Sequence, residues 1–443
     1  MTNVALPSIM RSFGSSLPQT EWVVLIYLLT ITSSLLFWGS FSDRHGKCTV
    51  YLIGMFIFTV GSFACYFAVS LNGLCLFRFV QAVGASMMMA TGPAIIKMVY
   101  PISKLGMALG AIGIATSTGL MLGPVISGVL IHNYSWRVIF LVTIPLSSTV
   151  FVIGWLWLRP IYMHAEKTEN SSSTDWPGII LWATLISAVV FLSTIYSQMS
   201  GKTVVAGIIA ILLLAIIFIK TELKQRTPLL PLVLFSRRSY AVAIFCAALS
   251  FTVLFVVLIL MPFYMDYILN FSAQQIGFVM MSIPLSVFLV SPISGILFDR
   301  MGARFLTTAG LSIAAFSLLF ICMLSENSGA IDIAWRLALL GCGQALFLSP
   351  NSADVLASVD SDQVGISSGL LATARNLGML TGVTLAGLLF GSIFSKLTDG
   401  LDLKQFQPEQ AGSFMTALIA TFGITAVLSL VGAVLSGLRR TRS

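Results

Sequence analysis

Long apolar runs dominate this chain, each about 18–25 residues in length, which is enough for a helix to cross the hydrocarbon core of a bilayer. Only helices and closed barrels satisfy backbone hydrogen bonds in that solvent, and these runs lack the alternation of barrel strands. Hydrophobic residues make up 57% of the 443 residues and charged residues 9%, whereas soluble chains carry about 25% charged residues. The sequence therefore predicts an all-α integral membrane protein.

Thirteen of these runs are predicted to be complete spans: residues 21–42, 48–70, 73–96, 105–131, 137–158, 176–198, 203–220, 239–262, 275–298, 305–324, 333–350, 363–392 and 413–437. The apolar residues 3–10 are too short to cross the bilayer and are predicted to end a fourteenth, truncated first helix. Two origins for this start remain open: translation that begins upstream of Met1, or a damaged copy. The first predicts about 12–25 further, mostly apolar residues upstream.

Lysine and arginine are distributed unevenly between alternate loops. With the loop at 43–47 assigned to the cytosol, sixteen of the 24 Lys and Arg residues fall in cytosolic loops, six in outer loops and two within spans. Basic loops tend to remain in the cytosol. The sequence therefore predicts a multi-pass protein of the cytoplasmic (inner) membrane with a cytosolic C-terminus.

An internal repeat divides the chain into two helical halves, residues 1–158 and 239–443. Between them, residues 159–238 hold two polar connectors and an inserted helix pair at 176–220. The repeat consists of a short turn whose residues recur 256 positions further on: Gly39, Asp43, Arg44 and Gly46 in the first half, and Gly295, Asp299, Arg300 and Gly302 in the second. Duplicated halves of this kind are typical of transporters.

The repeated turn, Gly39-x3-Asp43-Arg44-x-Gly46-Lys47, resembles the signature loop of the major facilitator superfamily. Its glycines permit a tight turn, while Arg44 and Lys47 can face anionic headgroups. The resemblance implies a fold of two six-helix halves, extended here by the inserted pair. It also implies that this loop and its second copy act as a conformational latch on the cytosolic side.

Arg78 and Gln81 lie inside an apolar span, three residues apart and therefore on one helix face. An arginine within a span is costly unless it faces a partner or water. The stretch Leu74-x3-Arg78-x2-Gln81-Ala-x-Gly84 is similar to a second motif of the superfamily, which implies a role in proton coupling. Glu21 and Asp266, near the outer ends of spans, are further candidates for proton coupling or, alternatively, solvated boundary residues.

A glycine-rich span, Gly110-x8-Gly119-x3-Gly123-Pro124-x2-Ser127-Gly128, is similar to the motif that distinguishes antiporters within the superfamily. Its glycines allow close approach on two sides, and Pro124 disturbs the hydrogen bonding of the helix. These properties suit a helix between the halves whose packing changes during transport. A bulky residue at Gly123 is therefore predicted to abolish export.

Further stretches resemble the drug:proton antiporter branch with fourteen helices, among them Ser135-Trp136-Arg137, Asp175-x2-Gly178 and Gly365-x3-Gly369-x5-Arg375. The resemblance implies efflux of small amphipathic or drug-like molecules, and hence antibiotic resistance, by a monomer that uses the proton gradient and no cofactor. Five residues are candidates to line the substrate cavity, with ordinary helix packing as the alternative for each: Tyr27, Met88, Tyr264, Gln344 and Asn376.

Other functional classes find little support in the sequence. No ATP-binding GxxxxGK[ST] loop and no HExxH pair occur, and the six cysteines lack metal-ligand spacing. The stretch 365–369 fits GxSxG by letter, but it opens an apolar helix and no histidine follows it. The net charge of +8 is explained by basic loops rather than by nucleic acid binding. Two rivals remain: an importer or symporter of a metabolite, and a non-transporting relic or sensor.

Overall fold

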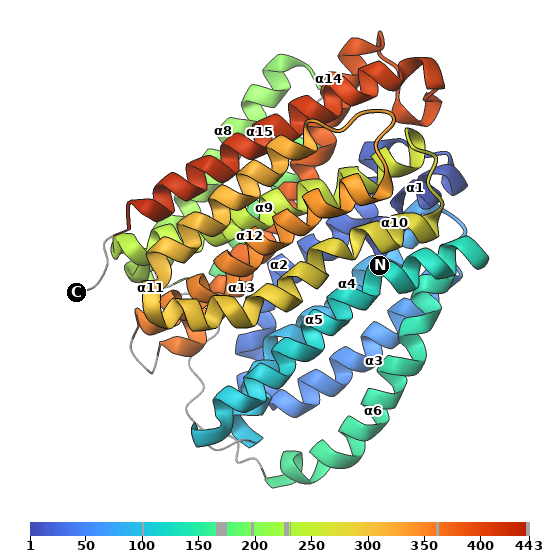
Figure 1. Cartoon of the computed structure of the whole chain (residues 1–443). Coiled ribbons are helices and arrows are strands. Elements are labelled where there is room, and N and C mark those ends of the chain that lie inside the picture. Colours follow the sequence, from blue (N-terminus) through green and yellow to red (C-terminus); the bar gives the residue numbers. More distant parts are fainter. Residues whose placement is uncertain are drawn as a thin grey trace. The chain divides into compact units, whose positions relative to one another are not determined.

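The computed structural model describes residues 1–99, 102–164, 175–195, 199–225, 230, 232–359 and 363–439 (Figure 1). Its helices are α1 (Thr2–Phe13), α2 (Leu17–His45), α3 (Lys47–Tyr66), α4 (Leu71–Val99), α5 (Ile102–Asn133), α6 (Val138–His164), α7 (Trp176–Ile195), α8 (Gly201–Lys224), α9 (Arg238–Tyr267), α10 (Ala273–Met280), α11 (Ser282–Ile321), α12 (Ala330–Ala357), α13 (Val364–Leu385), α14 (Gly391–Leu397) and α15 (Ala411–Gly437). A π-helical segment, η3 (Ala386–Phe390), joins α13 to α14. Within the described ranges no strand occurs, so the all-α class is confirmed.

Every predicted span corresponds to helical structure. Among the described residues, twelve helical segments are long and apolar enough to cross a membrane, and the stretch Thr118–Asn133 of α5 is a shorter apolar helix. The observed helices run past the predicted ends: α2 covers Leu17–His45 where the sequence predicted 21–42. Bilayer thickness limits only the apolar part of a helix, while backbone hydrogen bonding continues into the interface. The chain is a multi-pass membrane protein.

The glycine of the repeated turn has the same backbone conformation in both copies. Gly46 separates α2 from α3 with a φ of 90°, and Gly302 has a φ of 74°. Residues with a β-carbon rarely adopt such angles. The second copy also forms a break between two helical segments, because the backbone at Gly302 is non-helical and divides α11 there.

The chain forms two compact units. The first contains Met1–Glu21, Ile114–Trp136 and Val233–Ser443, and the second contains Trp22–Gly113 and Arg137–Leu232. The chain passes between the units four times: within α2, within α5, between Trp136 and Arg137, and between Leu232 and Val233. The start of α2 and the second part of α5 therefore pack with the C-terminal part of the sequence.

In the second unit, α3 packs against α4 and α6. The backbones of α3 and α4 meet at Gly54 and Gly84, where a β-carbon on either glycine would collide with the other helix. Small residues allow this close approach between membrane helices. The inserted α7 packs on α2 through Trp182, whose indole N–H donates to the carbonyl of Thr32 at 3.2 Å.

In the first unit, α11 packs along α12 and α15 (Figure 1). A β-carbon at Gly310 of α11 would lie 2.6 Å from the carbonyl oxygen of Gly343 in α12, and the reverse distance is also 2.6 Å. Gly310 follows Gly54 by 256 residues, the offset of the repeated turn. Each unit therefore contains a crossing of two helices at a pair of glycines.

Candidate functional site

Arg78 is buried in α4 and links three helices of the second unit. Its Nε donates to the carbonyl oxygen of Val23 in α2 at 3.0 Å, and its Nη1 donates to Oε1 of Gln81 at 2.6 Å. Gln81 in turn donates to the hydroxyl of Ser62 in α3 at 2.7 Å. The Arg78 guanidinium also lies over the ring of Tyr27, 4.0 Å from its centroid. The predicted placement of Arg78 and Gln81 on one helix face is confirmed.

The partners of Arg78 are electrically neutral. Its contacts with the described residues are a backbone carbonyl, a side-chain amide and aromatic faces, including Phe140 at 5.9 Å, and only 6% of the residue is exposed. A buried ion pair would cancel the charge of the guanidinium, but this arrangement only solvates it. A cation held in this way inside a span is a candidate functional group.

α5 meets α10 at a point where neither helix has a side chain. A β-carbon at Gly128 would lie 2.5 Å from the carbonyl oxygen of Ala273, and one at Gly277 would lie 2.5 Å from that of Pro124. Real β-carbons essentially never come this close to a backbone atom. Any larger residue at either glycine would therefore push the two helices apart.

The other glycines of the antiporter motif have more open surroundings. A β-carbon at Gly123 would approach only Met1, at 3.7 Å, and one at Gly119 would meet no atom within 4 Å. The close approach that the sequence suggested for Gly123 is made by Gly128 in this structure. Gly110 lies in a stretch of α5 whose side-chain surroundings fall outside the described residues.

An ion pair joins α1 to α9. Nη1 of Arg11 contacts Oδ2 of Asp266 at 2.5 Å, and Nη2 contacts Oδ1 at 3.0 Å, so the pairing is bidentate. The Asp266 side chain is 11% exposed and that of Arg11 is 55% exposed. Two parallel charge-assisted hydrogen bonds fix the orientation of both groups. Asp266, a sequence candidate for proton coupling, is therefore engaged by a partner that the sequence did not reveal.

Glu21 is a carboxyl group of a different kind. It is 3% exposed, and its Oε1 has no hydrogen-bond partner among the described residues. Both carboxyl oxygens lie against Gly387, where a β-carbon would collide with them. Gly387 belongs to the π-helical segment η3, and such segments are frequent at functional sites. No ion-pair partner of Glu21 occurs among the residues that the structure describes, and this distinguishes Glu21 from Asp266.

The first copy of the signature turn is exposed at the end of α2. Its Asp43 carboxylate pairs with Lys47 at 3.2 Å and is 63% exposed. Arg44 is exposed as well, and a β-carbon at Gly39 would meet no atom within 4 Å. Basic residues at an exposed turn of this kind can contact anionic headgroups.

The second copy of the turn lies within α11. Open space surrounds Gly295, and Arg300 is exposed. The side chain of Asp299 is outside the described residues. In both copies an exposed arginine, Arg44 or Arg300, follows at the same distance in sequence after the first glycine.

The predicted cavity residues fall into two groups. Tyr264 and Gln344 are buried in the first unit and hydrogen-bonded: the Tyr264 hydroxyl donates to the carbonyl of Ser325 at 2.6 Å, and Gln344 exchanges bonds of 2.8 and 2.9 Å with Ser250. Ordinary packing, the alternative kept open for these residues, accounts for both. Tyr27 and Met88 are half-buried in the second unit, and Asn376 is 3% exposed in the first.

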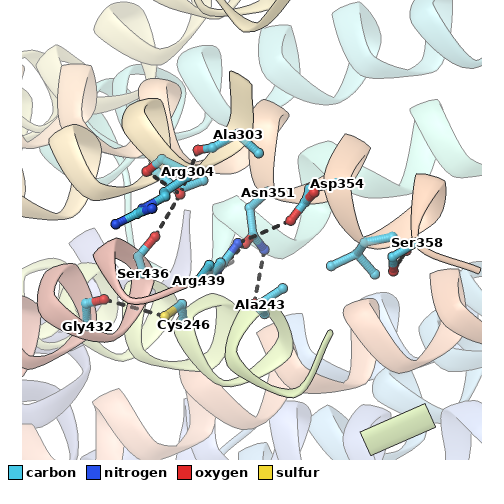
Figure 2. A network of polar contacts seen from close by, with 12 residues as sticks. Ala243, Cys246, Ala303, Arg304, Asn351, Asp354, Ser358, Gly432, Ser436 and Arg439 are labelled. Carbon is cyan, nitrogen blue, oxygen red and sulfur yellow. Dashed lines mark hydrogen bonds and ion pairs between the residues drawn. The ribbon is translucent and has the colours of Figure 1, made fainter. Parts of the chain in front are cut away.

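A polar network at one end of the first unit was not anticipated from the sequence. Figure 2 shows Arg439, at the end of α15, extending between Asn351 and Asp354 of α12. Its Nη2 donates to Oδ1 of Asn351 at 2.8 Å, and its Nη1 lies 3.5 Å from Oδ2 of Asp354. Asn351 donates onward to the carbonyl of Ala243 in α9 at 3.1 Å. Although Arg439 is close to the chain end, its side chain is only 2% exposed.

Two more arginines hold the same end of α12. Arg375 of α13 donates to the hydroxyl of Ser352 at 2.6 Å, and Arg237, just before α9, donates to the carbonyl of Ser358 at 2.7 Å. Cations are favoured near the carbonyl end of a helix. Together with Arg439, these residues attach α9, α13 and α15 to the last two turns of α12. In the sequence, Arg237 and Arg439 fall among the basic residues that were counted as cytosolic loop residues.

Replacing Arg439 with alanine is expected to destabilise the protein. The change removes a hydrogen bond that a charged group donates, worth about 1.5–3 kcal/mol, and leaves the buried Oδ1 of Asn351 without this donor. The apparent unfolding midpoint in detergent should fall by a few degrees. The matched control is Arg238→Ala, an exposed arginine one residue into α9, which should change the midpoint little. Equal midpoints for both variants would contradict the structural role of Arg439.

Comparisons with known proteins agree with this architecture. The Major Facilitator Superfamily model matches residues 1–383 and, separately, residues 240–443. The riboflavin transporter RibZ of Clostridioides difficile is 31% identical over 98% of this chain and 92% of its own length. The multidrug resistance protein Stp of Mycobacterium tuberculosis (strain CDC 1551 / Oshkosh) is 29% identical over 89% of this chain and 73% of its own.

A third relative and a solved structure extend the comparison. The methyl viologen resistance protein SmvA of Salmonella typhimurium (strain 14028s / SGSC 2262) is 24% identical over 91% of this chain and 82% of its own. A crystal structure of the peptide transporter POT in complex with sulfate has a TM-score of 0.68 at 14% identity, covering 98% of this chain and 89% of the other. At that identity the likeness concerns the fold alone. The family match over most of the chain and the relatives, all transporters rather than enzymes, establish that this chain belongs to the Major Facilitator Superfamily.

Proposed function

We propose that this protein exports small amphipathic or drug-like molecules in exchange for protons, by alternating access. The observation that carries the proposal is the side-chain-free contact of α5 with α10 at Gly128 and Gly277. It lies on the helix whose glycine spacing resembles that of exporters. A contact between bare backbones can close tightly and can part without disengaging interlocked side chains.

Relatives support this substrate class. Two of them carry resistance in their names, one to multiple drugs and one to methyl viologen, and a third is named for riboflavin. Methyl viologen and riboflavin are small ring compounds that also carry polar or charged groups. A shared preference for small molecules with an apolar and a polar part fits all three names.

Three contacts in the first unit would close the outer side of the transporter. They join α5 to α10 at Gly128, α1 to α9 at Arg11, and the start of α2 to η3 at Glu21. Each connects a helix from the first half of the sequence with one from the second half. In the proposed cycle these contacts part together to release substrate outward, and they re-form when the protein opens toward the cytosol.

Glu21 is the proposed proton-binding group. An ionised carboxylate without a counter-charge is costly in an apolar interior. A neutral carboxylic acid can remain against Gly387, whereas an ionised one gains by reaching water. Proton binding would therefore favour the closed outer contact, and proton release would favour its opening. Asp266 is the less suitable candidate because Arg11 already neutralises it.

Replacing Glu21 with glutamine should separate coupling from transport. The amide has nearly the size of the neutral acid, so the contact with Gly387 and the fold should persist. In proteoliposomes, accumulation driven by a pH gradient should fall to background, while downhill exchange of substrate should continue. The matched control is Glu326→Gln, an exposed carboxylate that should retain gradient-driven transport. Unchanged accumulation by the Glu21 variant would exclude Glu21 as the proton site.

The proposed function itself is tested by the direction of transport. Everted membrane vesicles that acidify their interior should accumulate an exported compound, whereas an importer should accumulate substrate only in right-side-out vesicles. Absence of proton-linked flux in both preparations, for a panel of dyes, biocides and riboflavin, would favour the non-transporting alternative.

We further propose that the chain belongs to the fourteen-helix drug:proton antiporter branch of its family and functions as a monomer in the cytoplasmic membrane. The excess of basic residues in alternate loops supports a cytosolic C-terminus. Reporter fusions at the C-terminus and at Ser172 should both be active only in the cytosol. An external signal from either fusion would contradict this topology.

A further inference from the structure

Arg375 is a charged residue inside a span that the proposed transport cycle does not yet use. It lies in α13, nine residues into the candidate span Ile366–Leu397, which corresponds to about 13 Å along a helix. Its Nη2 donates to the hydroxyl of Ser352 in α12, and its guanidinium lies 5.8 Å from the ring centroid of Phe251 in α9. Three helices of the first unit therefore meet at this side chain (Figure 1).

α13 is fixed against α9 on the side that carries Arg375. A β-carbon at Gly382 would lie 2.6 Å from the carbonyl oxygen of Thr252, and one at Gly378 would collide with the backbone of Ala248. These glycines follow Arg375 by seven and three residues, so they share its helix face. The hydroxyl of Thr252 also donates to the carbonyl oxygen of Gly378 at 3.1 Å. The backbone that carries Arg375 is thus held in one position, as a binding group requires.

The charge of Arg375 has no carboxylate opposite it. Among the described residues its hydrogen-bond acceptor is a neutral hydroxyl, and it takes part in none of the ion pairs found there. The buried arginines of the same unit differ in this respect, because Arg336 pairs with Asp332 and Arg439 lies 3.5 Å from Asp354. A charge without a partner inside a span indicates a functional group.

One end of the Arg375 guanidinium is open. Its Nε is enclosed by protein, whereas Nη1 is not enclosed and donates to no acceptor in the part of the chain that the structure describes. A guanidinium that faced lipid at this depth would be very costly, so the open side faces water. Each Nη carries two N–H groups. Both N–H groups of Nη1 are therefore left for an acceptor that arrives from water.

We propose that Arg375 binds an oxyanion, a carboxylate or a phosphate, carried by the exported molecule. Guanidinium groups bind such oxyanions through short, charge-assisted hydrogen bonds. The half-buried ring of Phe251 beside the guanidinium offers an apolar face to the rest of the ligand. The inference rests on the proposed function and narrows its substrate class to amphipathic molecules whose polar part is an anion.

A pair of flavins tests the preference for an oxyanion. Riboflavin and riboflavin 5′-phosphate share one fluorescent ring and differ in the phosphate, and each is titrated against purified protein in nanodiscs of zwitterionic lipid. The unaltered protein should bind the phosphate about tenfold more tightly, since it gains a charge-assisted hydrogen bond. Arg375→Gln should bind both flavins equally, and Arg375→Lys should keep part of the preference because it keeps the charge. Equal binding by the unaltered protein would overturn the proposal.

A second lipid composition distinguishes cargo from headgroup. Phosphatidylglycerol also carries a phosphate, and anionic headgroups attract basic residues. In nanodiscs that contain this lipid, the preference for riboflavin 5′-phosphate should persist. Its disappearance there would show that a lipid phosphate occupies Arg375, and the assignment to the exported molecule would be wrong.

Two control variants separate binding from the attachment of α13 to α12. Arg237→Gln removes an exposed arginine that also donates to α12, at the carbonyl of Ser358, and it should keep the preference. Ser352→Ala removes the hydrogen bond between the helices but leaves the charge, so it should keep most of the preference. If Ser352→Ala and Arg375→Gln behave alike, Arg375 only joins the helices and binds no oxyanion.

A labelling experiment tests the site without any assumption about the cargo. Ser352→Cys places a thiol beside the guanidinium, and mass spectrometry follows its reaction with a negatively charged and with a neutral methanethiosulfonate. Because Arg375 should attract the anion, adding Arg375→Gln should lower the rate of the anionic reagent, relative to the neutral one, about fivefold or more. An unchanged ratio, or a thiol that neither reagent reaches, would overturn the proposal.

Failure of this inference and failure of the proposed function give different results. Anion-selective labelling that depends on Arg375, without proton-linked flux of any compound, would overturn the antiporter function and leave the oxyanion site standing. Proton-linked flux that Arg375→Gln does not alter, together with equal binding of the two flavins, would do the reverse.

Discussion

Replacing Gly128 with leucine should reduce proton-driven export about tenfold or more. The side chain would begin at a point 2.5 Å from the carbonyl oxygen of Ala273 and 3.0 Å from the α-carbon of Gly277, so α5 and α10 could not keep their contact. Overpacking of this kind costs about 1–3 kcal/mol. Because only the closed state carries that cost, the balance between conformations should shift by about 5–150-fold. Gradient-driven uptake into everted vesicles measures the effect.

The same motif provides a matched control for this prediction. Gly119→Leu introduces the same side chain into the same helix, where no atom lies within 4 Å. That variant should express and export normally. Gly277→Leu should reproduce the defect from the partner helix, and the double variant should be little worse than either single one. Normal export by the Gly128 variant would show that the contact does not take part in transport.

Replacing Arg78 with alanine should abolish proton-coupled export. The truncation removes the donor from the carbonyl oxygen of Val23 and from the side-chain oxygen of Gln81, at about 1–3 kcal/mol for each unsatisfied buried group. It also removes the cation from the ring of Tyr27. Arg78→Lys keeps the charge but cannot donate in two directions as a planar guanidinium does, so it should retain partial activity. Accumulation driven by a pH gradient is the measurement.

The control for Arg78 is Arg336→Ala in α12. Arg336 is a similarly buried arginine, but it is paired with Asp332 of its own helix at 2.5 Å. Its loss should lower stability without removing coupling. Gradient-driven accumulation by Arg78→Ala at the level of the unaltered protein would remove Arg78 from the mechanism.

The fold was predictable because its determinants are local. Apolar runs locate the helices, and the Gly46 and Gly302 turns mark the duplication without any tertiary information. The contact of Arg78 with Gln81 could also be predicted from the sequence, since residues three apart on a helix are neighbours. The ends of the helices were harder to predict. Hydropathy marks where a helix leaves the membrane, whereas the helix itself ends at its last backbone hydrogen bond.

The contacts that connect distant segments could not be read from the sequence. Arg11 and Asp266 are 255 residues apart, and their pairing depends on α1 packing against α9. Likewise, spacing alone does not decide which glycine of a motif meets a neighbour: Gly123 and Gly128 look alike, but only Gly128 faces α10. Nothing in the sequence around Gly387 indicates that it is important, because its role depends on the Glu21 carboxyl group, which packs against it only in the folded protein.

The glycine crossings of α3 with α4 and of α11 with α12 have a practical consequence for handling the protein. Contacts between helix backbones at glycines depend on van der Waals packing. They do not depend on lateral pressure from the lipid or on the charge or type of its headgroups. These helix pairs should therefore survive extraction into mild detergents. The ion pair of Arg11 with Asp266, which is half open to its surroundings, should by contrast respond to ionic strength. A purified sample can thus keep a high melting temperature after its transport cycle has already been disturbed, and activity rather than thermal stability is the appropriate guide when detergents are chosen.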